Sequence, residues 1–265
     1  MGTWEEIFES GDTTYSEKIG TQNQLFELVK LQFLVSIFPP EPVKTLEVGC
    51  GAARTSLYFA KRGYKTTLLD QSKKVLGIAK KNYKKESSKG TFIVGDAEKL
   101  PFKANSFDVV MSFGLLEHFK DPPQAIDEMG RVLKPGGLFF ADIVPKRFSV
   151  QTIGNVFNFA FSVCYWSLRL RPRTGLERGI RNFRPIYYEN SLSWQEYKKF
   201  IKKAGIKSVE VRGNRPFPRL TLPGLLDRAC AFLMKLFLPF WRKFDSWDSF
   251  IPRFWGAGWW LWGTR

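Results

Sequence analysis

The sequence contains little cysteine and almost no histidine, and both shortages restrict its chemistry. Its three cysteines, Cys50, Cys164 and Cys230, stand far apart, in no spacing used for zinc binding or for a redox pair. His118 is the only histidine in 265 residues. This composition argues against a disulfide-stabilised fold and against a metal centre built from these residues, so we expect no metal site and a reducing compartment.

Strongly apolar runs are also scarce. The N-terminus is acidic at Glu5 and Glu6 and has no apolar core, so we expect no signal peptide and a cytoplasmic protein. Met1-Gly2 would suit N-myristoylation, but Glu6 stands where that signal needs Ser or Thr. Residues 148–168 carry no charge over twenty-one positions, yet contain too many polar side chains for a typical membrane-spanning helix.

Positive charge, in contrast, is abundant and unevenly distributed. Residues 1–145 carry 19 basic and 18 acidic residues, for a net charge of +1, whereas residues 146–265 carry 22 and 7, for +15. Eight of the nine tryptophans also lie in the second half. A basic, aromatic surface suits an anionic partner, such as nucleic acid, phospholipid headgroups or a phosphorylated substrate.

The first half alternates between two apolar periodicities. The pattern predicts helices over 23–38, 53–62, 72–86 and 121–133, and strands over 43–48, 64–69, 91–94, 107–112 and 137–143. Such alternation is typical of an α/β protein with a doubly wound, mostly parallel sheet.

The first predicted strand runs directly into a glycine-containing turn. Gly49 and Gly51 allow a tight turn and leave room for a ligand, and the following helix directs its free N–H groups at that turn. Arg54 stands where a dinucleotide site has its third glycine, which packs helix and strand around a pyrophosphate. The turn therefore favours a ligand without a pyrophosphate.

This stretch resembles motif I of the class I S-adenosylmethionine (SAM) methyltransferases, acidic-x-Gly-x-Gly, with Glu47 as its acidic residue. Asp70 ends the next strand nineteen residues after Gly51, at the spacing of a ribose-binding carboxylate. The remaining landmarks follow in order: Gly95-Asp96-Ala97, the strand 107–112, and Leu133-Lys134-Pro135-Gly136-Gly137 as the turn into the fifth strand.

The resemblance implies SAM as cofactor, S-adenosylhomocysteine as product, and a Rossmann-like sheet of seven strands with an antiparallel last strand. The cofactor-binding residues that it implies are Glu47, Gly49, Cys50, Gly51, Asp70, Gln71, Asp96, Ala97, Ser112 and Phe113. Glu47 could serve instead to hold the loop in shape, Asp70 to cap the next helix and Asp96 to form a turn.

His118 follows the fourth strand, beside the methyl-transfer site that the resemblance implies. A neutral imidazole there could accept a proton from a substrate hydroxyl, which makes His118 the candidate catalytic residue. The alternative is a structural or substrate-packing role.

We divide the chain into an N-terminal helical cap (1–40), a SAM-binding core (41–145), a basic, aromatic helical insertion (146–192) and the C-terminal part of the fold (193–265). In the last part, Ser193 opens a helix with a capping box, and strand 208–213 should pair antiparallel with 258–264. Between these strands, we expect an apolar helical stretch, 222–244, near the ligand cleft and kinked at Pro239.

The favoured function is methyl transfer to a small amphipathic or membrane-located acceptor: a lipid, a prenylated ring or a lipid-linked sugar. The arginine-flanked apolar stretches 148–168 and 222–244 suggest a platform on the cytoplasmic face of an anionic membrane, although core or dimer packing is the alternative. Two other functions stay open. One is an RNA methyltransferase that uses the basic half, which lacks a recognisable RNA-binding module. The other is a catalytically silent SAM-fold adaptor at a membrane or partner surface.

Overall fold

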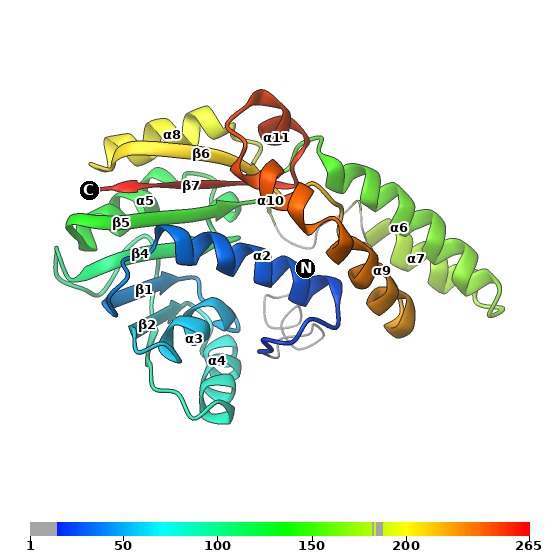
Figure 1. The fold of residues 1–265 in the computed structure, drawn as a ribbon, viewed down its shortest axis with the longest axis horizontal. Helices are drawn as coiled ribbons and strands as arrows, with labels where there is room; N and C mark the ends of the chain where they lie inside the picture. Colours follow the sequence, from blue (N-terminus) through cyan, green and yellow to red (C-terminus); the bar gives the residue numbers. More distant parts are fainter. Residues whose placement is uncertain (1–14, 182, 184–187) are drawn as a thin grey trace.

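A seven-stranded sheet forms the centre of the molecule, in a computed structural model that describes residues 15–181, 183 and 188–265 (Figure 1). Its strands are β1 (Lys44–Val48), β2 (Lys65–Asp70), β3 (Thr91–Val94), β4 (Phe107–Phe113), β5 (Leu133–Ile143), β6 (Lys207–Asn214) and β7 (Gly258–Thr264). Their order across the sheet is β3-β2-β1-β4-β5-β7-β6. The chain reverses direction across the sheet between β1 and β4, where ligands of doubly wound sheets bind.

The last two strands confirm the predicted topology. The first five strands pair in parallel, whereas β7 lies antiparallel to β5 on one side and to β6 on the other. Val211 of β6, for example, faces Leu261 of β7. The segment Leu133–Gly137, predicted as a turn before the fifth strand, belongs to β5 itself. The pairing of β5 with β4 shifts register there, so the segment forms an irregular strand start.

Helices cover both faces of the sheet. They are α2 (Gln22–Ile37), α3 (Arg54–Ala60), α4 (Lys73–Lys85), α5 (Pro123–Val132), α6 (Val150–Ser167), α7 (Pro172–Arg181), α8 (Trp194–Lys203), α9 (Gly224–Leu236), α10 (Leu238–Ser246) and α11 (Phe250–Trp255). A 3₁₀ turn spans Leu116–His118. The predicted capping box at Ser193 is present. The Ser193 hydroxyl accepts a hydrogen bond from the N–H of Glu196, and the Glu196 carboxylate accepts one from the N–H of Ser193.

Alternate residues of the strands pack on opposite faces of the sheet. On one face, Phe139 packs with Met129 of α5 and Ile201 of α8. On the other face, Phe140 packs with Leu34 of α2 and Trp241 of α10.

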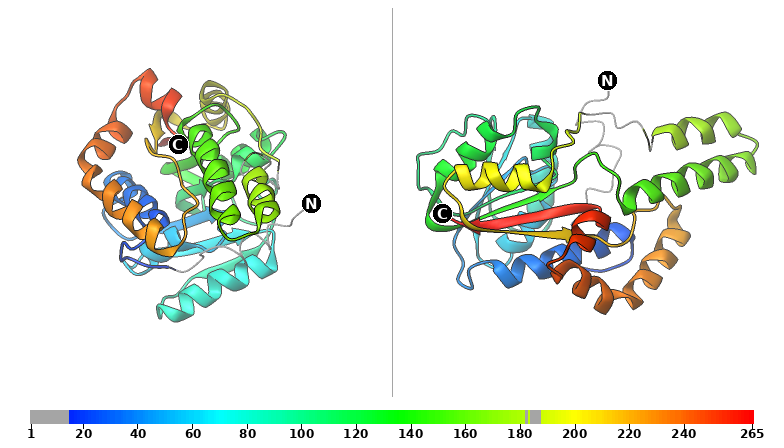
Figure 2. Two further views of the ribbon diagram at one scale, coloured as in Figure 1. Left: turned by 90° about the vertical axis from the view of Figure 1, so that its right-hand side faces the viewer. Right: turned by 90° about the horizontal axis from the view of Figure 1, so that it is seen from above.

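The α6–α7 hairpin projects from the body of the molecule (Figures 1 and 2). The polar stripe of α6 faces inward. Asn158 is buried and bonds Arg219 and Thr221, whereas Val156 and Phe157 are exposed. This arrangement is the reverse of an ordinary amphipathic surface helix.

The stretch 222–244 contains a break rather than a kink. Helix α9 ends at Leu236 and α10 begins at Leu238, with Pro239 in its first turn, where a missing N–H costs nothing. Among the described residues, no helix is long and apolar enough to cross a membrane. Residues 1–14 of the expected N-terminal cap lie outside the described part, and the remainder of that range contains α2.

Candidate functional site

The loop after β1 is held open by residues with positive φ angles. Gly49 (φ +69°) and Gly51 (φ +53°) turn the chain, and Ala53 (φ 54°) leads into α3. A Cβ on Gly49 would lie 2.7 Å from the Leu115 side chain, so only glycine fits there. The loop therefore has the open backbone that the sequence predicts for a ligand-binding turn.

Asp70 ties this loop to the end of β2. Its Oδ2 accepts a hydrogen bond from the Gly51 N–H (3.1 Å) and its Oδ1 from the Ser72 N–H (3.0 Å). Burial raises the carboxyl pKa, while these hydrogen bonds lower it. The carboxylate stands at the predicted ribose position and keeps lone pairs for further donors. Gln71, next to it, is exposed.

Glu47 holds the loop in shape. Its Oε2 accepts hydrogen bonds from both the N–H and the hydroxyl of Ser56 on α3. Burial is the main cause that raises its pKa to about 7. These contacts match the alternative role predicted for Glu47, which is to hold the loop in shape. Cys50 is also buried, and burial raises the pKa of its thiol well above the usual value, so it packs as an apolar side chain.

The remaining predicted cofactor residues stand at the ends of β3 and β4. Asp96 accepts from the Glu98 N–H (2.9 Å), and Ala97 beside it is buried. Ser112 is fully buried. The ring of Phe113 lies under the Lys30 ammonium, 4.3 Å from the ring centroid. Since β3, β2, β1 and β4 are neighbours, the sheet brings all these residues to one carboxyl edge.

His118 does not line the cavity that adjoins the glycine loop, and its imidazole is hydrogen-bonded to the backbone of Tyr188. Its Nδ1 lies 2.8 Å from the Tyr188 carbonyl oxygen, which can only accept, so Nδ1 carries the proton. Burial lowers the pKa of the imidazole, although hydrogen bonds with the backbone of Tyr188 and Gly114 raise it in part. His118 does not line the cavity. Its role as a base stays a prediction.

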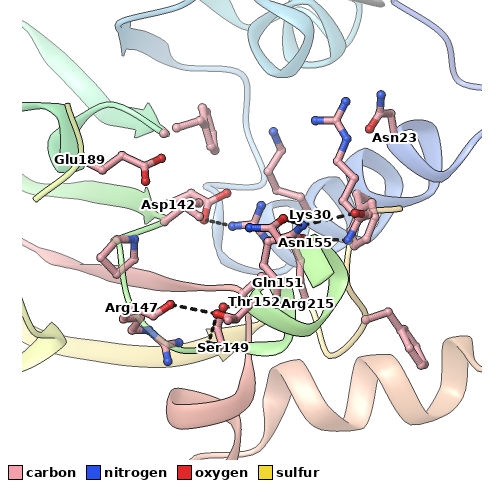
Figure 3. A pocket seen from close by; sticks show the side chains of 18 of the residues that line it. Asn23, Lys30, Asp142, Arg147, Ser149, Gln151, Thr152, Asn155, Glu189 and Arg215 are labelled. Atoms are coloured by element: carbon pink, nitrogen blue, oxygen red, sulfur yellow. Dashed lines mark hydrogen bonds and ion pairs between the residues drawn. The ribbon is translucent and has the colours of Figure 1, made fainter. Parts of the chain in front are cut away.

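A cavity of about 990 Å³ adjoins the glycine loop. It reaches from Ala52 and Phe113 to α6, the segment after β6, and α10. Figure 3 shows side chains that line it, among them Lys30, Asp142 and Asn155. Aromatic side chains that line it include Phe26, Phe113, Phe217, Trp241 and Trp260. The predicted helical excursion after β6 thus contributes to the cleft, as expected.

A polar network that the sequence pattern did not predict crosses this cavity. Arg215, just after β6, donates from its guanidinium to Asp142 Oδ1 (3.3 Å) and to Asn214 Oδ1 (2.7 Å). Its backbone N–H donates to Asp245 (3.0 Å), which also accepts from the Trp241 indole (2.9 Å). One signal was available, because Asp142 is a carboxylate close to the end of the apolar strand β5, much as Asp70 is the last residue of β2.

The fold and this edge define a class: a Rossmann-like sheet with an antiparallel last strand is the class I methyltransferase fold. Residues 46–141 match the family model described as a methyltransferase domain. The chain thus contains a methyltransferase domain of the class I SAM-dependent type. The open turn at Gly49–Gly51 and the Asp70 carboxylate fit SAM, the cofactor of such domains. Among the described residues, no cluster of His, Cys, Asp and Glu could hold a metal ion.

Curated relatives are named for quinone chemistry. The chain is 41% identical over 177 residues to 2-methyl-6-phytyl-1,4-hydroquinone methyltransferase 2 of Oryza sativa, which covers 66% of this chain and 42% of that protein. It is 26% identical over 171 residues to the ubiquinone biosynthesis O-methyltransferase of Aromatoleum aromaticum, covering 64% and 66%. The chain thus spans about two thirds or less of these relatives' length.

A solved SAM-dependent methyltransferase from Thermotoga maritima shares the fold. It matches 90% of this chain and 89% of its own, with a TM-score of 0.55 and 19% identity.

Proposed function

We propose that the protein transfers the methyl group of SAM to a small lipophilic acceptor, and that this acceptor is a hydroxylated, prenylated ring. The observation that carries the proposal is the cavity beside the glycine loop, whose aromatic walls come from α2, β4, β7 and α10. Flat aromatic walls suit a ring, and about 990 Å³ accommodates a ring with an attached chain. The names of the relatives give independent support for this acceptor class over a lipid-linked sugar.

The protein contributes alignment and a dry site. Bound SAM supplies the electrophilic methyl on a sulfonium. The loop at Gly49–Gly51, held by Asp70 and by the brace of Glu47 to Ser56, fixes where that cofactor lies. Phe113 and Trp260 exclude water from the acceptor side. Orientation of this kind accounts for a large part of enzymatic rate acceleration.

Binding of SAM tests the cofactor half of the proposal. We expect Asp70→Ala to weaken SAM binding roughly ten- to a hundredfold, because a charged hydrogen-bond acceptor is worth on the order of 1.5–3 kcal/mol. Asp108→Ala is the matched control, since Asp108 begins β4 at the opposite edge and pairs with Lys134 (2.6 Å). Titration calorimetry that shows no heat with SAM, or equal affinity in both variants, contradicts this assignment.

Methyl transfer to hydroquinones tests the acceptor half. The protein, with radiolabelled SAM, should methylate a prenylated hydroquinone faster than the same ring without its chain, because the chain buries apolar surface in the cavity. Mass spectrometry of lipids that co-purify with the protein should show a hydroxylated ring. Transfer to transcribed RNA but to no hydroquinone would favour the RNA methyltransferase instead.

We further propose that this acceptor is reached at the surface of an anionic membrane, on its cytoplasmic face. The tip of the α6–α7 hairpin supports the proposal: Leu168 is 86% and Leu170 is 91% exposed. Arginine side chains surround the tip. Arg169 lies over the Tyr165 ring (4.4 Å) and Arg178 over the Trp166 ring (4.6 Å). Amphipathic aromatic rings and arginines at the two sides of exposed leucines suit the headgroup region of a bilayer.

A second apolar surface lies on α9. Its exposed side chains include Leu225, Phe232, Leu233 and Leu236. Helix α9 and the α6–α7 hairpin extend toward the same side of the molecule (Figures 1 and 2). Both elements can therefore meet one surface.

Flotation with vesicles of phosphatidylglycerol and phosphatidylcholine tests membrane binding. Leu168→Asp with Leu170→Asp should abolish flotation while SAM binding stays intact, whereas Val35→Asp, on half-exposed α2 surface, should leave flotation unchanged. Wild type that stays at the bottom of the gradient in low salt rules out this location. Flotation without methyl transfer to any acceptor would favour the silent adaptor.

A further inference from the structure

Asp142 occupies a fixed place at the carboxyl edge of the sheet. It pairs with Phe113 of the neighbouring β4, and its carbonyl accepts from the Gly114 N–H (2.9 Å). On its other side it pairs with Trp260 of β7. Its side chain lines the cavity, with 11% of its surface exposed. Two strands therefore hold this carboxylate next to the site where β4 ends.

The two oxygens of Asp142 have different surroundings. Oδ1 accepts from Asn214 Nδ2 (3.2 Å) and from the Arg215 guanidinium (3.3 Å). For Oδ2 no partner is found among the described residues. One oxygen is thus anchored, and the other can bind a group inside the cavity.

The anchoring side chains are themselves held. Arg215 has a φ of 61°, an unfavourable conformation for a residue with a side chain, and its N–H donates to the buried carboxyl of Asp245. Asn214 is fully buried. Figure 3 shows Asp142 and Arg215 pointing toward one another in the lining of the cavity. A strained backbone that serves one hydrogen-bonding arrangement indicates that the arrangement has a function.

We propose that Asp142 is the proton acceptor of the reaction, and that Arg215 and Asn214 are its positioning residues. The inference rests on the proposed function, a hydroxylated ring as acceptor. As the hydroxyl proton moves to Asp142 Oδ2, the electron pair of the O–H bond stays on the acceptor. A ring oxygen, or the ring carbon that the oxygen activates, then bonds the methyl carbon, while the methyl–sulfur bond breaks and its electron pair returns to sulfur. In the case of carbon attack, the proton on that ring carbon leaves afterwards to water.

Other titratable groups near the cavity are less suited to this role. Both carboxyl oxygens of Asp245 already accept hydrogen bonds, and His118 lies outside the cavity. Glu189 lines the cavity, but it lies on an irregular segment rather than on the sheet. The negative charge of Asp142 raises the pKa of Glu117 and of Asp245. The positive charge of Arg215, which pairs with Asp142, lowers the pKa of Asp245.

The test compares Asp142→Asn with Glu189→Gln, using methylhydroquinone and chlorohydroquinone as acceptors alongside the prenylated ring. Asp142→Asn should reduce turnover by roughly 10²–10⁴-fold with unchanged SAM affinity, and Glu189→Gln by less than about tenfold. Without the acceptor for the proton, the variant depends on spontaneous ionisation of the ring. Its rate should therefore rise about tenfold per pH unit and recover most with the more acidic chlorinated ring. A structural role would produce neither effect. Asp142→Glu should restore part of the turnover.

Four outcomes overturn the inference. Turnover of Asp142→Asn within a few-fold of wild type contradicts it alone, as does an equal loss with every ring at every pH. Loss in Glu189→Gln instead assigns the proton to that carboxylate. A wild type that methylates no hydroquinone contradicts the proposed function, and this inference with it.

Discussion

Replacing Glu117 by glutamine should change how the stability of the protein depends on pH. Glu117 is 2% exposed, and its Oε1 accepts from the Val144 N–H (3.0 Å). Its Oε2 is buried and has no hydrogen-bond partner in the part of the chain that the structure describes. Burial is the main cause that raises its pKa from 4.5 to about 8, and the carboxylates of Asp142 and Glu189 raise it further. The folded protein therefore keeps Glu117 neutral at pH 7.

The sign of the effect follows from proton binding. Between pH 4.5 and about 8 the folded state holds a proton on Glu117 that the unfolded chain has lost. The contribution of Glu117 to the unfolding free energy is thus highest below pH 4.5 and falls by about 1.4 kcal/mol for each pH unit up to about 8. The whole fall is on the order of 3–5 kcal/mol, a large part of the stability of an ordinary domain.

Glutamine resembles the neutral acid in shape but does not ionise. Urea unfolding at about pH 5 and about pH 8.5 should therefore show a fall in wild type that is smaller in Glu117→Gln by on the order of 3–5 kcal/mol. Glu177→Gln is the matched control, because Glu177 is exposed on α7 and its replacement should leave the pH dependence of wild type in place. Equal pH dependence in wild type and Glu117→Gln would refute the reasoning, because it would mean that Glu117 is already ionised in the folded protein.

Two further substitutions distinguish local roles. His118→Ala should keep turnover in a methyl-transfer assay within about tenfold of wild type, because the imidazole is held by the Tyr188 carbonyl outside the cavity. A loss of roughly 10²–10⁴-fold with intact SAM binding would instead identify His118 as the base. Gly213→Ala should prevent folding or lower the melting temperature strongly, because a Cβ at this position of β6 would overlap the backbone carbonyl of Pro252 in α11. Gly224→Ala is the control: a Cβ at this position, at the start of α9, meets nothing within 4 Å, so the melting temperature should stay close to that of wild type. Calorimetric melting that shows equal effects for the two variants would contradict the contact at Gly213.

The sheet could be predicted because its signals are local. Each strand of the core is a short apolar run that ends in a turn, and the order of the landmarks from Glu47 to Gly137 fixes their places. The pairing of 208–213 with 258–264 was also correct. The limits of β5 were not, since Gly136 and Gly137 suggest a turn, although strand pairing with β4 continues past them.

The orientation of α6 could not be predicted, because periodicity separates two faces without saying which one is inside. Asn158 faces inward because the chain at Arg219 and Thr221, some sixty residues later, offers backbone partners for its amide. Trp241 lies in the core for a similar reason, since Asp245 accepts its indole N–H.

The acceptor side of the site depends on contacts of this long-range kind. The loop at Gly49–Gly51 and Asp70 could be recognised from their spacing along one motif. Asp142, Arg215 and Asp245, in contrast, come from three elements that meet only in the folded chain. His118 drew attention because it is the single histidine, but its position beside Tyr188 keeps it outside the cavity.

The position of β7 has a consequence for the order in which the molecule folds. Within the described residues, strand β6 is bonded to the sheet only through β7, and 43 residues separate the two strands along the chain. Closing that loop costs conformational entropy before any strand pairing repays it. Until β7 is in place, β5 is an unpaired edge with apolar residues on both sides, which can pair with another chain. The loop that contains α9, α10 and α11 must therefore close before the sheet is complete, and within it α10 also lines one side of the cavity.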